Sequence, residues 1–396
     1  MCFVFWIMRV FLYLLVSFLF FLTNGATAFA IENPLGVSNN RFGVHILFPE
    51  EVERASNLVN SSGGEWGYVT IPIQASDRDL KKWQKFMDDC FKYKIIPIIR
   101  IATENYYFDT KVWREPTEED IIDFANFLNS LDWPIKNRYV VIFNEVNRFD
   151  EWGGNVNPGE YGRILEYAVA FFKSRSQNFF VISAGLDNAA DNRPNHFMDQ
   201  YDFIVKMNSG VPGIFNQVDG LASHSYPNPG FKQSPSVDTN KSIASFRHES
   251  LLVKQISGKD HPIFITETGW SLQNVKEEKV ADYFEEAFDS VWNSENLVAV
   301  TPFLLRAGMG PFSQFSLINI DGSPNLAYRS LQNIPKVKGT PIMLKTDKKE
   351  LEMSLKREHL PTKNFVGSIS GQNNKASQII NGLKAVKSIL KWLINP

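Results

Sequence analysis

The chain has 396 residues, with 41 Lys and Arg against 43 Asp and Glu, which gives a net charge of −2 at pH 7. The total divides unevenly, because residues 31–335 carry −11 and residues 336–396 carry +8. The acidic body argues against nucleic acid as the main partner, and a hydrophobic share of 44% excludes a disordered or collagen-like chain.

The first 30 residues have the pattern of an export signal. Arg9 precedes an apolar run from Val10 to Leu22, and the sequence Ala28-Phe29-Ala30 fits a signal-peptidase site. Cleavage there leaves Cys90 as the one cysteine and excludes an intrachain disulfide. An uncleaved N-terminal anchor is the alternative, although a charge inside an apolar segment is costly in a membrane. We therefore expect a secreted or cell-envelope protein.

Residues 31–335 alternate between short apolar runs and amphipathic helical stretches, a pattern typical of strand–helix units in a parallel sheet. Eight runs are predicted as strands: Phe42–Leu47, Gly67–Ile73, Ile95–Ile101, Tyr139–Phe143, Phe179–Ala184, Gly220–His224, Ile263–Thr266 and Val298–Leu304. Eight such units close an α/β fold into a (β/α)8 TIM barrel. A doubly wound sheet is the other architecture, but the segment after the first strand lacks the Gly-rich phosphate loop typical of it.

Two glutamates follow predicted strands at matching places. Asn144 and Glu145 come directly after the fourth strand, and Glu267 comes directly after the seventh, in a Thr-Glu-Thr-Gly-Trp sequence. Functional side chains of a barrel lie at the carboxyl ends of its strands. One such glutamate alone is more often a helix-capping or surface acid, but two together indicate a pair of catalytic carboxylates.

These two motifs resemble those of clan A glycoside hydrolases, such as families 5 and 39, over roughly residues 40–332. The resemblance implies that Glu145 is the acid/base, Glu267 is the nucleophile and Asn144 binds the sugar 2-hydroxyl. It implies no cofactor, and the sequence contains no HExxH motif or paired CxxC motifs that would predict a metal site.

Other residues at strand ends are candidates for the same site. By the resemblance, Tyr226 binds the nucleophile and His224 lines the sugar site; a turn with Tyr226 merely packed is the alternative. Arg100 ends an otherwise apolar strand, where it either lowers the pKa of the nucleophile or pairs with a loop acid such as Glu104. Further candidates at the mouth are His45 and Asp187-Asn188.

Aromatic side chains in the loops are candidates for packing on sugar rings. They are Trp152, Trp270, Phe312 and Phe315, of which Trp270 is the strongest prediction. The eighth strand of clan A enzymes often ends in Trp, whereas this chain reads Thr301-Pro302-Phe303, so the floor of the sugar site is expected to be Phe or a later residue.

The implied chemistry is a double displacement with retention of configuration. Glutamates on these two strands are expected to lie about 5 to 5.5 Å apart, the separation typical of retaining glycosidases. The expected substrate is a β-linked polysaccharide or oligosaccharide. A non-hydrolytic carbohydrate-binding barrel at the cell surface, or another hydrolase or a lyase using the same acids, are the alternatives.

The C-terminal part of the chain has a different composition. Residues 336–371 are Lys-rich and predict a linker, and residues 372–396 repeat apolar side chains at helical spacing with lysines on another side. This basic amphipathic helix is suited to contact a membrane or cell envelope. Packing against the acidic barrel or another chain is the alternative, and a monomer is expected.

Overall fold

The computed structural model describes residues 31–105 and 111–344. The predicted export signal, the predicted amphipathic helix and the linker beyond residue 344 lie outside the described residues. Within the part that is described, no helix combines the length and hydropathy needed to cross a membrane.

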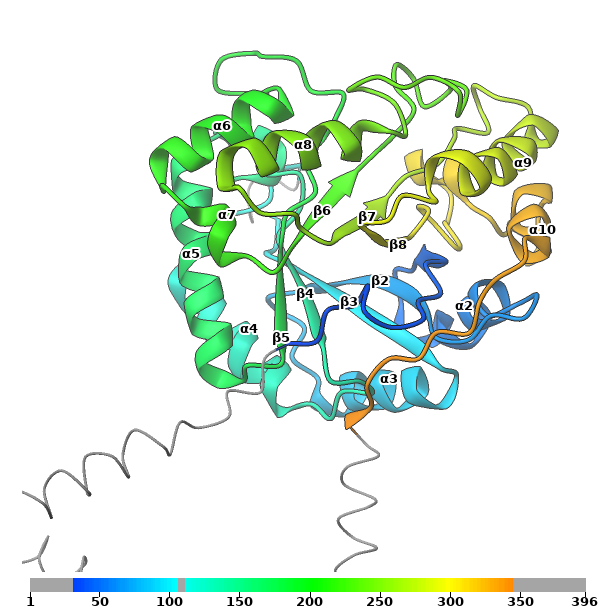
Figure 1. The fold of residues 1–396 in the computed structure, drawn as a ribbon, viewed down its shortest axis with the longest axis horizontal. Helices are drawn as coiled ribbons and strands as arrows, with labels where there is room; N and C mark the ends of the chain where they lie inside the picture. The colour runs from blue at the N-terminus through cyan, green and yellow to red at the C-terminus, as the bar shows by residue number, and fades with distance from the viewer. Residues whose placement is uncertain (1–30, 106–110, 345–396) are drawn as a thin grey trace, which may run out of the picture. The chain divides into compact units, whose positions relative to one another are not determined.

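Eight parallel strands form one sheet in chain order. They are β1 (Gly43–His45), β2 (Gly67–Gln74), β3 (Ile95–Ala102), β4 (Arg138–Ile142), β5 (Phe179–Ser183), β6 (Gly220–His224), β7 (Ile263–Glu267) and β8 (Leu297–Val300). A parallel bridge between Phe42 and Val300 brings the last strand back to the first. The predicted (β/α)8 TIM barrel is therefore confirmed (Figure 1).

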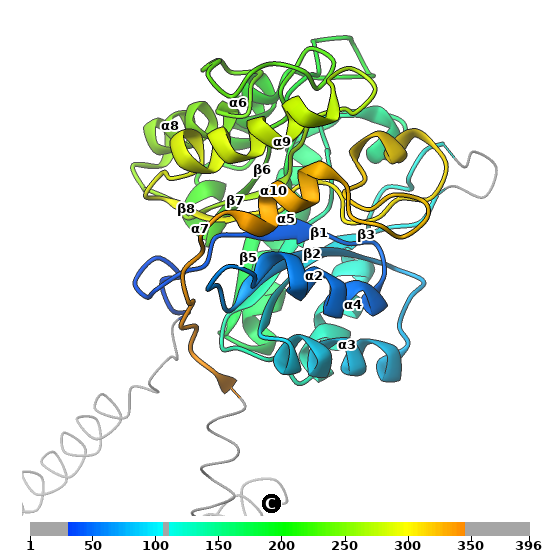
Figure 2. The ribbon, with the colours of Figure 1, turned by 90° about the vertical axis from the view of Figure 1, so that its right-hand side faces the viewer.

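Helices surround these strands, as the two views in Figures 1 and 2 show. They are α2 (Val52–Val59), α3 (Leu80–Lys92), α4 (Glu118–Ser130), α5 (Pro158–Arg175), α6 (Gln200–Gly210), α7 (Ile214–Gln217), α8 (Ser245–Ser257), α9 (Glu277–Glu286) and α10 (Leu326–Asn333), with short turns η1 (Pro49–Glu51), η2 (Phe149–Glu151), η3 (Ala287–Val291) and η4 (Pro311–Phe315). Side-chain caps fix several helix starts; Thr117, for example, accepts from the backbone N–H of Asp120.

The predicted first and eighth strands, Phe42–Leu47 and Val298–Leu304, are longer than the observed β1 and β8. Beyond Val300, the chain still bonds to β1, because the His45 N–H donates to the Pro302 carbonyl and the Leu305 N–H donates to the His45 carbonyl. Proline has no N–H with which to continue the ladder. The apolar residues after β8 are instead buried beneath the mouth.

Aromatic side chains fill the amino-terminal end of the barrel interior. Tyr68, Tyr139, Phe180 and Phe264 are each the second residue of their strand, and all are buried. The Tyr139 ring centroid lies 5.0 Å from that of Phe180 and 5.2 Å from that of Phe264. Because this end is packed, the barrel offers space for a ligand at the carboxyl ends of the strands.

The first residues of the predicted linker belong to the barrel. Lys338 pairs with Glu65, Met343 pairs with Ile135, and the Lys136 N–H donates to the Ile342 carbonyl at 2.7 Å. The packed unit therefore extends past the predicted boundary at residue 335. Backbone pairing joins this segment to the residues before β2 and β4, and composition alone does not reveal such pairing.

Lys336 closes the end of α10 and is 9% exposed. Its ammonium group donates to the carbonyls of Leu331 at 2.7 Å and Ile334 at 2.9 Å. We expect Lys336→Ala to lower the free energy of unfolding by about 1 to 3 kcal/mol, because buried carbonyls lose their donor. Urea denaturation followed by tryptophan fluorescence measures this.

Lys338→Ala is the matched control, because that lysine pairs with Glu65 while 70% of its side chain is exposed. Its loss should stay within about 0.5 kcal/mol. Equal losses in the two variants would contradict a capping role for Lys336.

Candidate active site

A cavity of about 780 Å³ opens among the loops that follow the strands. Its lining includes Glu145 after β4 and Glu267 at the end of β7. Both carboxylates are mostly buried, with 14% and 10% of their side chains exposed. The structure therefore brings the two predicted glutamates into one site.

An irregularity in β7 turns Glu267 toward this cavity. Phe264 points into the barrel, and strict alternation would turn Glu267 the other way. On the neighbouring strand, however, Ser223 pairs with Ile265 whereas His224 pairs with Glu267, so β7 contains one extra residue at this point. Such bulges re-aim side chains next to functional sites.

Glu267 is surrounded by groups that favour its charged form. Arg100 Nη1 lies 2.6 Å from Oε1, the Tyr226 hydroxyl donates to Oε2 at 3.0 Å, and His45 Nε2 lies 3.8 Å from Oε1. Burial alone would raise the pKa of this carboxyl, but the nearby groups, led by His224 and Arg100, hold it well below its usual range. Glu267 is thus a carboxylate at neutral pH.

Glu145 lies just beyond the strand in a left-handed backbone conformation, with φ of 36°. Its N–H donates to the Gly185 carbonyl at 2.9 Å. Its Oε1 lies 3.0 Å from His224 Nδ1, and its Oε2 lies 3.4 Å from Arg148 Nη1. Non-glycine residues rarely adopt such a conformation, and here surrounding contacts hold it.

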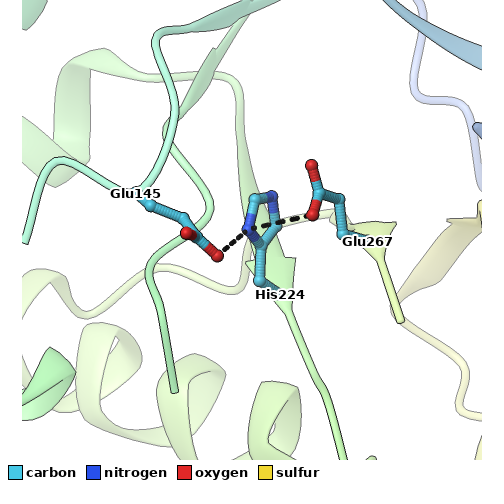
Figure 3. Close-up of side chains that lie close together, drawn as sticks. All are labelled: Glu145, His224 and Glu267. Atoms are coloured by element: carbon cyan, nitrogen blue, oxygen red, sulfur yellow. Dashed lines mark hydrogen bonds and ion pairs between the residues drawn. The ribbon is translucent and has the colours of Figure 1, made fainter. Parts of the chain in front are cut away.

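His224 stands between the two carboxylates, as Figure 3 shows. One oxygen of Glu145, one oxygen of Glu267 and a ring nitrogen of His224 all lie within 4.8 Å of one another. The distance between the two carboxyl oxygens is closer to the spacing of about 5 to 5.5 Å in retaining glycosidases than to the spacing of about 6.5 to 9.5 Å in inverting ones.

The same three side chains have the donor types of a metal site. A cation bound there would stand against two guanidinium groups, since Arg100 contacts Glu267 and Arg148 contacts Glu145. Two fixed cations beside the carboxylates oppose the binding of a further cation, so the arrangement fits a reacting carboxylate pair better than a metal centre.

A glycine allows His224 to reach this position. The histidine is 1% exposed, and a Cβ on Gly185 would lie 2.3 Å from its Cδ2 atom and 2.5 Å from its Nε2 atom. Burial lowers the pKa of His224, but Glu267 and Glu145 raise it more, so the net shift is upward. The two carboxylates therefore favour the protonated form of His224.

Arg100 joins the nucleophile candidate to Asn144. Its Nη1 also donates to the side-chain oxygen of Asn144, which lines the cavity. The alternative partner, Glu104, pairs instead with Arg114 at 2.7 Å. Because the Asn144 oxygen faces Arg100, its amide N–H groups are directed elsewhere, and one of them donates to the Glu151 carboxyl.

Two predicted sugar-binding tryptophans are instead part of the core. Trp152 is 1% exposed and packs on Phe143 and Tyr161. Trp270 is 2% exposed, packs on Trp292 and donates its ring N–H to a backbone carbonyl at 2.7 Å. The expectation for both rings was wrong because these loops fold back between strands and helices, which hides the flat faces from any ligand.

Phenylalanines supply the aromatic wall of the cavity. The predicted Phe312 is 52% exposed and lies against Phe303, with ring centroids 5.2 Å apart, and the predicted Phe315 lines the same wall. Phe303 follows β8 and lines the cavity, in keeping with the expectation of a Phe in this region. Phe48 and Phe231, which the sequence analysis missed, also line the cavity.

The remaining candidates at the mouth divide between cavity and support. Asp187 lines the cavity. Asn188 is 2% exposed and donates to the Tyr226 carbonyl at 2.9 Å, so it supports the loop after β6. His45 is fully buried behind Glu267 and packs edge-on against Phe303.

Among the charged residues of the cavity wall that sequence reasoning missed are Arg148, Asp150 and Glu151. They follow Glu145 within six positions, and this proximity was the one signal available. Burial and the charge of Glu145 raise the pKa of Glu151 to about 7. The wall next to Glu145 is therefore charged, in contrast to the aromatic wall.

The sequence matches no protein-family model and no curated protein. Among solved structures, the chain is similar to a family 39 glycoside hydrolase from Bacteroides cellulosilyticus WH2, with a TM-score of 0.54 and 15% identity over 77% of this chain and 64% of that one. It therefore spans somewhat less than two thirds of that protein.

Two further structures agree. One is a GH5_18 protein from Bifidobacterium longum subsp. infantis, with a TM-score of 0.52 and 12% identity over 74% of this chain and 78% of that one. The other is a GH39 β-xylosidase from Caulobacter crescentus, with a TM-score of 0.50 and 12% identity over 75% and 72%. The chain thus has the barrel fold of glycoside hydrolases in the families that its motifs resemble.

The contact between Arg100 and Glu267 predicts a pKa change. Because the carboxylate loses an adjacent cation in Arg100→Met, the pKa of Glu267 should rise by about 1 to 3 units. Carbon-13 NMR titration of labelled glutamate carboxyls measures it, with the resonance assigned through Glu267→Gln. Arg100→Lys keeps a cation, so the pKa of Glu267 should rise less in that variant. An unchanged pKa of Glu267 in Arg100→Met would show that Arg100 does not lower it.

Removing a buried and an exposed aromatic side chain should lower the free energy of unfolding by different amounts. Trp270→Ala should lower the free energy of unfolding by about 3 to 5 kcal/mol, because it empties a packed site. Phe312→Ala should change it by about 0.5 kcal/mol or less, because half of that ring faces solvent. Chemical denaturation compares them, and a small loss in Trp270→Ala would show that its ring is not part of the core.

Proposed function

We propose that the protein is a retaining glycoside hydrolase that cleaves β-linked oligosaccharides or polysaccharides. The observation that carries the proposal is the pair Glu145 and Glu267, brought within 4.8 Å in a cavity at the strand ends and given unlike surroundings. The barrel shared with glycoside hydrolases supports it. The β-linkage and the sugar polymer come from the resemblance of the motifs.

In the first step, the Glu267 carboxylate attacks the anomeric carbon of the sugar. A carbon–oxygen bond to Glu267 forms as the glycosidic bond breaks, and Glu145 gives its proton to the departing oxygen. Arg100 and Tyr226 keep Glu267 ionised and oriented for this attack. Asn144, which accepts from Arg100, is the residue that the motif resemblance assigns to the 2-hydroxyl of the bound sugar.

In the second step, Glu145 acts as a base. It takes a proton from water as the water oxygen attacks the anomeric carbon, and the bond to Glu267 breaks. Two inversions at one carbon leave the configuration unchanged. While Glu267 is esterified it carries no charge, which removes its repulsion of the Glu145 carboxylate and favours that carboxylate as the base.

Separate variants of the two glutamates test the assignment on an activated aryl β-glycoside. Glu267→Gln should lower turnover by at least about 10³-fold, because no covalent intermediate forms. Glu145→Ala should lower turnover, and added azide should restore it and yield a β-glycosyl azide, since azide needs no general base.

Glu267→Gln is the control for the azide experiment, because azide should not yield a β-glycosyl azide with that variant. Undiminished turnover in either variant would contradict the mechanism. An α-glycosyl azide from Glu145→Ala would contradict retention.

A non-hydrolytic carbohydrate-binding barrel is the second candidate. The feature that favours it is Phe303 at the place where clan A enzymes often have Trp. Binding of β-glucans, mannans, xylans or galactans by the wild-type protein, without release of reducing ends, would support this candidate over hydrolysis.

A further inference from the structure

The charged cluster beside Glu145 has no part in the two steps above. It consists of Arg148, Asp150 and Asp187, all of which line the cavity. None of them belongs to the motifs that suggested the catalytic pair. Their contacts centre on one guanidinium group.

A tight turn places Arg148 over the acid that precedes it. The Arg148 N–H donates to the Glu145 carbonyl at 2.9 Å, so the chain turns back within three residues. Arg148 Nη1 then lies 3.4 Å from Glu145 Oε2 and 3.2 Å from an Asp187 carboxylate oxygen. The local backbone therefore brings the cation to the carboxyl of Glu145.

Two aspartates hold this guanidinium in place. Nε and Nη2 of Arg148 donate to the two oxygens of Asp150 at 3.0 and 2.8 Å, a two-point contact that fixes the plane of the group. Asp187 is fixed in turn by the buried Asn147, whose side chain accepts from the Asp187 N–H at 2.9 Å and donates to its carbonyl at 3.0 Å.

The two oxygens of Glu145 therefore have different neighbours. Oε1 is hydrogen-bonded to His224, and among the described residues Arg148 is the ion-pair partner of Oε2. Without the guanidinium, the hydrogen bond between His224 and Oε1 would be the one contact of these two left to limit rotation of the carboxyl about its last bond. Orientation matters because the acid must lie within hydrogen-bond reach of the departing oxygen.

The aspartates also offset the charge of the guanidinium. A lone cation beside Glu145 would favour the carboxylate and oppose proton donation. Here Asp150 and Asp187 share the charge of Arg148, and Glu267 adds negative charge on the other side of His224. The two aspartates thus offset the charge that Arg148 brings to Glu145.

We propose that Arg148 is a positioning residue that directs the Glu145 carboxyl toward the leaving-group oxygen and is itself held by Asp150 and Asp187. The inference rests on the proposed function. On this inference, the charged wall of the cavity holds Glu145 in the orientation in which it protonates a poor leaving group.

Leaving groups of different acidity test this inference. The dinitrophenolate of a dinitrophenyl β-glycoside departs without protonation. The alcohol of an alkyl β-glycoside of the same sugar departs only if its oxygen is protonated. In Arg148→Met, kcat/KM, which reports the first step, should fall by about 10²-fold or more on the alkyl substrate and by less than about tenfold on the dinitrophenyl substrate. Asp150→Asn, which loosens the guanidinium, should show the same preference with a smaller loss.

Arg114→Met is the matched control. Arg114 pairs with Glu104 and Asp120, has nearly the same side-chain exposure as Arg148 (29% against 30%), and does not line the cavity. Its kcat/KM should be unchanged on both substrates.

The outcomes separate the inference from the function on which it rests. Equal losses on both substrates, in Arg148→Met and in Asp150→Asn, would overturn the positioning role and indicate a role in folding or substrate binding. Full activity of Arg148→Met on the alkyl substrate would overturn it as well. If the wild-type protein cleaves neither substrate, the proposed function fails and the inference fails with it.

Discussion

The ion pair between Arg100 and Glu267 is the constraint on which the site depends. A carboxylate buried in a barrel is costly unless a cation and hydrogen-bond donors face it. Arg100 follows Ile96 and Ile98 on the inward face of β3, so a mostly apolar strand brings a cation to the barrel mouth. Tyr226 supplies the second oxygen with a donor. The same guanidinium also donates to the Asn144 side chain, so one cation holds both Glu267 and Asn144 in place.

The cavity is divided into two walls of different chemistry. The wall near Glu267 is aromatic, with Phe303, Phe312 and Phe315, and it suits the apolar faces of a sugar ring. The wall near Glu145 is charged, with Arg148 and Asp187 among its residues. Under the proposed mechanism, the charged wall is the one on the side of the leaving group, because Glu145 is the proposed acid.

Sequence periodicity and strand-end motifs predicted the barrel and the meeting of the two glutamates, because both depend on local pattern. The positions of Trp152 and Trp270 were not predictable in this way, since a tryptophan in a loop is equally suited to core and to ligand. The bulge that aims Glu267 was also hidden, because it depends on pairing between β6 and β7. The position of Arg148 was not predictable from the sequence, because it depends on a turn and on Asp187, which is distant in the sequence.

The two catalytic candidates owe their positions to different parts of the fold. Glu267 is the last residue of β7, so sheet hydrogen bonds hold its backbone. Glu145 lies beyond β4, and it is held by loop contacts to Gly185 and Arg148. Its left-handed backbone is stable only while those contacts persist. Changes in the loops after β4 and β5 should therefore affect proton transfer before they affect nucleophilic attack, and the Asn147 link between these loops couples the acid to the rest of the barrel.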